Sequence, residues 1–172
     1  ADINTLADWE NVLTLFRDSG KVAIPYWVPA STRLVHYLLA SFGVYNGGML
    51  YQLDGKVVFG AAQDGFKDYL ALYRDWYATG LLDVDFTSRS GNDSASQMMG
   101  GNVGLGQTYK AFYDTLNLVT ADGGHWVPLS APAREEGQTF DAAFAYVSRA
   151  IWQGTITVIS TSCDPAKIPV IL

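Results

Sequence analysis

An aromatic pair, Tyr26 and Trp27, lies between Pro25 and Pro29 in the stretch IPYWVPAST. Tyrosine and tryptophan combine a flat apolar ring with a hydrogen-bonding group, so they can stack on the apolar face of a sugar ring or fill a hydrophobic core. Tyr109 has the same chemistry, and like Trp27 it lies at a predicted junction between a loop and a helix, where ligand-binding groups often occur. For these aromatics the sequence leaves ligand stacking and core packing equally open.

Polar side chains that could recognise sugar hydroxyls follow or precede these aromatics closely. Gln107 and Thr108 directly precede Tyr109, and Arg33 follows the aromatic pair. Amide, hydroxyl and guanidinium groups supply the donors and acceptors that a rim of hydroxyls requires. We therefore predict these three residues as hydrogen-bonding partners of a ligand.

Other reactive residue types occur without the patterns that reactions need. His36 and His125 are isolated and form no metal-binding motif, and the glycines of GNVGLG match neither a dinucleotide-binding loop nor a P-loop. The single cysteine, Cys163, excludes an internal disulfide and has no protease signature around it. We predict no metal site, no cofactor and no catalytic residue.

Pairs of acidic residues keep a polysaccharide-acting enzyme open as an alternative function, because a glycosidase needs two carboxyl groups across its cleft. Spacing does not select any one pair, and acidic residues are common on solvated helix faces. The candidate pairs are Asp64 and Asp68, Asp83 and Asp85, and Glu135 and Glu136. A second alternative is a non-catalytic interaction module, which would expose a large apolar patch.

Composition limits the class of protein. The chain has 172 residues, of which 49% are apolar and 16% charged, as expected for one globular domain. The net charge is −6, from 11 basic and 17 acidic residues with no basic stripe, which argues against nucleic-acid binding. The apolar runs are too short for a membrane span, and residues 1–10 do not read as a signal peptide.

The first half of the chain contains helix and hairpin signals. The capping box from Thr5 to Asp8 predicts a helix over residues 6–18 that ends at Gly20. Residues 22–28 form a short apolar segment whose prolines argue against an ordinary central strand. A second helix is predicted from Ser31 or Thr32 to Gly43, and Asp54-Gly55 predicts a two-stranded hairpin over residues 51–59.

The second half begins with the clearest helix, over residues 64–80, which we expect to be the central packing helix. Its predicted apolar stripe comprises Phe66, Tyr69, Leu70, Tyr73 and Tyr77, and Trp76 is also expected in the core.

The remaining residues predict a polar loop over 87–96, a short helix at Met98, a strand that ends near Gln107 and a helix from Tyr109. Extended, proline-containing chain and a final strand follow, and Trp126 and Trp152 are expected to be structural. The fold class is α/β leaning towards α+β, helix-rich, with a small sheet packed against helices.

Four stretches in order resemble the extracellular solute-binding proteins of family 1, which have the type II periplasmic-binding-protein fold and serve bacterial ABC importers. The stretches are TLADWENVLTLFRDSG, IPYWVPASTRLVHYLLASFGVYNGG, DGKVVFGAAQDGFKDYLALYRDWYATGLLDVDF and MMGGNVGLGQTYKAF. In the last stretch Tyr109 or Phe112 stands where the family often has a cleft tryptophan, so both become candidate ligand contacts.

The resemblance implies two lobes joined by a hinge that close over a sugar or oligosaccharide and present it to permease subunits. It implies an extracellular or periplasmic binding protein, held at the cell surface as a lipoprotein and without enzymatic activity. Residues 1–172 would then be one domain, the second lobe, without the first lobe and the C-terminal helices. We expect such a lobe alone to bind sugar weakly, with Tyr26 and Trp27 at its edge facing the cleft.

Overall fold

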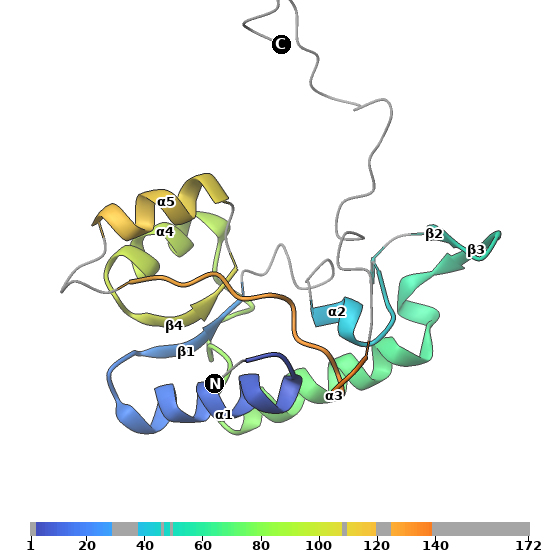
Figure 1. Ribbon diagram of the computed structural model, residues 1–172, viewed down its shortest axis with the longest axis horizontal. Coiled ribbons are helices and arrows are strands. Elements are labelled where there is room, and N and C mark those ends of the chain that lie inside the picture. Colours follow the sequence, from blue (N-terminus) through green and yellow to red (C-terminus); the bar gives the residue numbers. More distant parts are fainter. Residues whose placement is uncertain are drawn as a thin grey trace, which may run out of the picture.

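The computed structural model describes residues 3–28, 38–45, 47–48, 50–107, 110–119 and 125–138. These residues form a mixed α/β structure in which a short parallel sheet lies between two groups of helices (Figure 1). Helices α1 and α3 lie on one side of this sheet, and α4 and α5 lie on the other. The predicted α/β class is therefore confirmed at this level.

The parallel sheet consists of β1 (Ile24–Trp27) and β4 (Val103–Gly106). Ile24 pairs with Val103 and Trp27 with Gly106, and a single bridge joins Tyr26 to Leu82 on the other edge of β1. All four residues of β1 are buried.

The expectation that the prolines would keep this segment out of a central strand is therefore wrong. Pro25 lacks only its own N–H group, and the residues on both sides of it still pair with β4. The aromatic pair Tyr26 and Trp27 consequently belongs to a buried strand and not to an extended turn at an open edge.

Helix α1 (Leu6–Ser19) begins and ends where the sequence predicts. The Thr5 hydroxyl accepts a hydrogen bond from the Asp8 amide, and the Asp8 carboxylate accepts one from the Thr5 amide, which completes the capping box. Gly20 ends the helix with a φ of 61°, a conformation that glycine adopts without strain. Leu6, Trp9 and Leu13 face the core.

The hairpin of β2 (Leu50–Leu53) and β3 (Lys56–Phe59) is also confirmed. Asp54 and Gly55 have φ values of 50° and 78°, which matches the twist of a tight two-residue hairpin turn. The hairpin projects from the body of the structure, and its residues are mostly exposed (Figure 1). A one-turn 3-10 helix, Gly60–Ala62, links it to α3.

Helix α3 (Asp64–Ala78) carries the main aromatic core, as predicted, but its buried face differs. The buried residues are Tyr69, Tyr73 and Trp76, whereas Leu70 and Tyr77 are about half exposed. The spacing of four and then three residues places Trp76 on the inner face and rotates Leu70 and Tyr77 away from it.

Helix α4 (Gly91–Met99) begins inside the segment predicted to be a polar loop. Ser90 and Asp93 form a second capping box, in which the Asp93 carboxylate accepts from the Ser90 amide at 2.9 Å. The polar residues that suggested a loop therefore start a helix, because serine and aspartate are favoured at helix N-termini. Of the predicted second helix, only α2 (Leu38–Ser41) lies within the described residues.

After β4 the chain enters α5 (Lys110–Val119), so the predicted order of strand and helix is confirmed. Residues 125–133 then run back in extended form across the sheet to the start of α1, and a turn over residues 134–137 follows (Figure 1). The predicted final strand and Trp152 lie outside the described residues.

Candidate ligand-binding cavity

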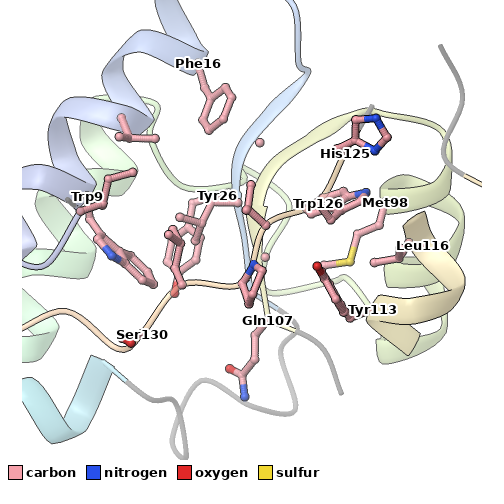
Figure 2. Close-up of a pocket in the computed structure, with 18 of the residues that line it drawn as sticks. Trp9, Phe16, Tyr26, Met98, Gln107, Tyr113, Leu116, His125, Trp126 and Ser130 are labelled. Carbon is pink, nitrogen blue, oxygen red and sulfur yellow. The ribbon is translucent and has the colours of Figure 1, made fainter. Parts of the chain in front are cut away.

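A cavity of about 800 Å³ lies above β4, between α1 and the pair α4 and α5 (Figure 2). Residues 125–131, which we call the covering segment, pass across it. Aromatic side chains converge on it from several elements, and they are Trp9, Phe16, Tyr26, Tyr113 and Trp126. Its volume falls within the range of small-molecule binding sites.

Two glycines in β4 let helix side chains approach the strand closely. A Cβ atom on Gly104 would lie 2.6 Å from Cδ2 of Phe16, and one on Gly106 would overlap Cε of Met98. Successive residues of a strand point to opposite faces of the sheet, so the two glycines lie on the face opposite to that of buried Val103 and Leu105. The VGLG sequence of β4 therefore provides a floor against which side chains of α1 and α4 can close.

The covering segment is fixed at its first end by Asn117 of α5. The Trp126 amide donates to Oδ1 of Asn117 at 2.8 Å, and Nδ2 of Asn117 donates to the Trp126 carbonyl at 3.3 Å. One side chain thus pairs with both backbone groups of Trp126, as a neighbouring strand would. This pair holds Trp126 beside the α4 and α5 wall of the cavity.

The other end of the covering segment is fixed at the start of α1. The Ala133 amide donates to the Asn4 carbonyl at 2.7 Å, and the Leu6 amide donates to the Ala133 carbonyl at 2.9 Å. The Ser41 hydroxyl donates to the Pro132 carbonyl at 2.6 Å. Between the two ends, Val127 is 77% exposed and Leu129 is 45% exposed, so the middle of the segment covers the cavity with little packing of its own.

Two buried polar atoms in the cavity wall lack hydrogen-bond partners. Trp9, whose side chain belongs to the core, has an unpaired Nε1–H, and Gln107 has an unpaired Oε1. A buried donor or acceptor without a partner is unfavourable, typically by about 1–3 kcal/mol. Neither atom has surface open to the cavity, so both are unsatisfied groups within the packed wall.

Tyr26 contributes little free surface to the cavity. It is 1% exposed, and its ring makes edge-to-face contacts with Trp9 at 6.0 Å and with Trp76 at 5.8 Å. Burial raises the pKa of its hydroxyl well above the usual tyrosine range, and Tyr73 is its hydrogen-bonding neighbour. Tyr26 is thus mainly a core residue that forms one edge of the cavity wall.

Trp27 is fully buried and does not line the cavity. The Arg89 guanidinium lies 5.3 Å from its ring centroid, and Nε of Arg89 donates to Oδ2 of buried Asp83 at 3.0 Å. Asp83 is the main cause of the raised pKa of Arg89. The predicted stacking position at Trp27 is therefore occupied by the protein's own cation.

The remaining predicted contacts divide into three groups. Gln107 lines the cavity, as expected of a ligand-binding residue. Phe112 is half-buried against the cluster around Met98 and is not among the cavity-lining residues. Tyr109, Thr108 and Arg33 lie outside the described residues.

Several cavity residues were not predicted, although a signal existed for some of them. Trp9 and Phe16 are separated by two helical turns, so helical spacing places them on one face of α1, but the sequence does not show which apolar face meets an empty volume. For Tyr113 on α5, the sequence likewise does not show whether its side of the helix meets an empty volume. Trp126 was expected to be structural, and its place in the wall depends on the pairing with Asn117.

Three of the predicted carboxylates form ion pairs within the protein. Asp83 and Asp85 both pair with Arg89, and Asp68 pairs with Arg134 at 2.8 Å. Among the described residues that line the cavity there is no aspartate or glutamate. No cluster of three or more potential metal-binding side chains occurs in the part of the chain that the structure describes.

Comparisons with known proteins do not identify this chain: no protein-family model matches it, and neither does any curated protein or solved structure. Within the described residues, none of the helices has the length and apolar character needed to cross a bilayer.

Proposed function

We propose that this protein is the substrate-binding component of a bacterial ABC importer and captures a sugar or oligosaccharide. The observation that carries the proposal is the 800 Å³ cavity with its converging aromatic rings. The resemblance of four ordered sequence stretches to extracellular solute-binding proteins supports it independently. The proposal places the protein outside the cytoplasm, where it would deliver its ligand to permease subunits.

The cavity offers the two kinds of contact that a sugar needs. The rings of Trp9, Tyr113 and Trp126 can cover an apolar C–H face, since aromatic side chains provide flat apolar surface. The polar residues that line the cavity, Gln107, His125 and Ser130, can exchange hydrogen bonds with the hydroxyls of the sugar. These groups bind and orient a ligand, and in the two-lobed arrangement that we propose, lobe closure would complete the contacts.

A thermal-shift and calorimetric screen tests this proposal. The 172-residue chain is mixed with linear and branched oligosaccharides at concentrations up to tens of millimolar, because we expect weak binding. A ligand present at ten times its dissociation constant should stabilise the folded chain by about 1.4 kcal/mol. Binding of an oligosaccharide supports the proposal, and no stabilisation by any member of the panel contradicts it.

Site variants show whether such binding uses the cavity. Trp126→Ala and Tyr113→Ala each remove a ring from the wall, and we expect each to weaken binding about tenfold. Tyr77→Ala is the matched control, because Tyr77 is an exposed aromatic residue on α3 that does not line this cavity. If the control weakens binding as much as the two wall variants, the cavity is not the site.

A further inference from the structure

The interior of the cavity is far more apolar than an unsubstituted sugar requires. Each ring of an oligosaccharide carries several hydroxyls that need partners once they are buried. The inner wall consists mainly of hydrocarbon and sulfur-containing side chains, namely Val12, Phe16, Met98, Leu105 and Leu116. Such a wall suits an apolar group, so a sugar that binds here keeps its hydroxyls at the polar rim of the cavity.

The polar groups are distributed unevenly around this interior. His125 and Ser130 lie on the exposed covering segment, at the solvent side of the cavity (Figure 2). The cavity thus matches a molecule with a flat apolar part and a polar part that remains near the solvent.

Resting on the function proposed above, we infer that the preferred ligands are glycosides with an aromatic aglycone, which are sugars linked to an aryl group. The aryl ring occupies the apolar interior between Phe16 and Trp126. The sugar lies at the rim, within reach of the imidazole of His125. Burial of the aryl ring contributes most of the affinity, because apolar surface removed from water is the main source of binding free energy in such a pocket.

Matched pairs of small glycosides test this inference by calorimetry. Phenyl and methyl glycosides of glucose, galactose, mannose and xylose are titrated into the 172-residue chain, together with phenol as a probe without sugar. For at least one sugar, the phenyl glycoside should bind about tenfold more tightly than its methyl partner, because its ring buries extra apolar area.

A double variant on the covering segment locates the aryl ring. Val127→Asn with Leu129→Asn makes the cover polar at two exposed positions, where folding should tolerate the change. We expect it to reduce the advantage of phenyl over methyl about threefold. The matched control is Leu118→Asn on α5, since Leu118 is 85% exposed and does not line the cavity, and it should change nothing.

The outcomes separate this inference from the proposed function. Equal affinities for phenyl and methyl glycosides, or tighter binding of unsubstituted oligosaccharides, overturn the inference and leave sugar capture standing. Phenol binding as tightly as the phenyl glycosides overturns the proposed function while keeping an apolar cavity. Absence of binding by every probe overturns both.

Discussion

The two sides of the β1 and β4 sheet use similar residues with different results. Between the sheet, α1 and α3, the rings of Tyr26, Tyr69, Tyr73 and Trp76 pack into a continuous core, with Tyr69 and Tyr73 only 4.5 Å apart between centroids. Towards α4 and α5, the buried cluster is smaller and adjoins the cavity.

The difference lies in what covers the side chains. In the first region two helices close over the sheet, whereas the cavity is crossed by a single extended segment that is attached at its ends. A pair of helices supplies continuous apolar faces, while an extended segment directs only alternate side chains inwards. Aromatic residues therefore become core in one region and cavity wall in the other.

The largest loss of stability is expected in the aromatic core between the sheet, α1 and α3. Trp76→Ala should destabilise the protein by about 3–5 kcal/mol, because it leaves a large void among buried rings. Trp126→Ala, at a half-buried wall position, should cost about 1–2 kcal/mol from lost apolar burial alone. Urea unfolding of both variants measures the two values, and equal losses would show that the two regions are packed alike.

Substitution of Arg89 tests how much its contacts with Asp83 and the Trp27 ring stabilise the protein. Arg89→Ala removes the partner of buried Asp83 and the cation beside the Trp27 ring, and should cost about 2 kcal/mol. The control is Arg74→Ala, whose ion pair with Asp75 is exposed and should contribute less than about 0.5 kcal/mol. Chemical denaturation compares them, and a loss no larger for Arg89→Ala than for the control would contradict the assigned role.

Alkaline pH should destabilise the tyrosine-rich core selectively. Burial raises the pKa values of Tyr26, Tyr69 and Tyr73, so they remain protonated in the folded state where the unfolded chain ionises. Their contribution is fully present below about pH 10 and is lost as the pH rises further, by up to about 1.4 kcal/mol per pH unit for each tyrosine. Tyr73→Phe should reduce the slope of unfolding free energy against pH. An unaltered slope in Tyr73→Phe would rule out its part in this effect.

The smallest expected effect concerns the attachment of the covering segment. Asn117→Ala removes both hydrogen bonds to the Trp126 backbone and should cost about 1 kcal/mol. Amide hydrogen exchange should show faster exchange at Trp126, since its N–H loses its acceptor. Leu118→Ala, at the next and exposed position, is the control. Unchanged protection at Trp126 would mean that other contacts hold the segment.

Local signals in the sequence predicted several elements well. The capping box at Thr5 and the stop at Gly20 bound α1, and Asp54-Gly55 forms the hairpin turn, because each signal acts over a few neighbouring residues. The same type of signal at Ser90 was assigned to a loop, since polar residues favour both loops and helix starts. Distinguishing the two requires the apolar partners that only the folded chain supplies.

The site was much less predictable than the elements. Gln107 is predicted because it lies close to Tyr109 in the sequence, but the wall residues Trp9, Tyr113 and Trp126 come from three distant segments. Trp27 carried a strong aromatic signal and nevertheless lies in the core beside Arg89. Residue type alone does not show whether a ring meets another side chain or an empty volume.

The sequence by itself determined the helix caps, the hairpin turn and the order of strand and helix around Gln107, because backbone preferences and short-range hydrogen bonds decide these features. Only the tertiary structure decided that β1 is buried, that α3 turns Leu70 and Tyr77 outwards and that residues 125–131 cross a cavity. Those outcomes depend on contacts between segments far apart in the chain, such as the hydrogen bonds from Ser41 to Pro132 and from Leu6 to Ala133. No local pattern specifies such contacts, so the location of the candidate site follows from packing and not from motif.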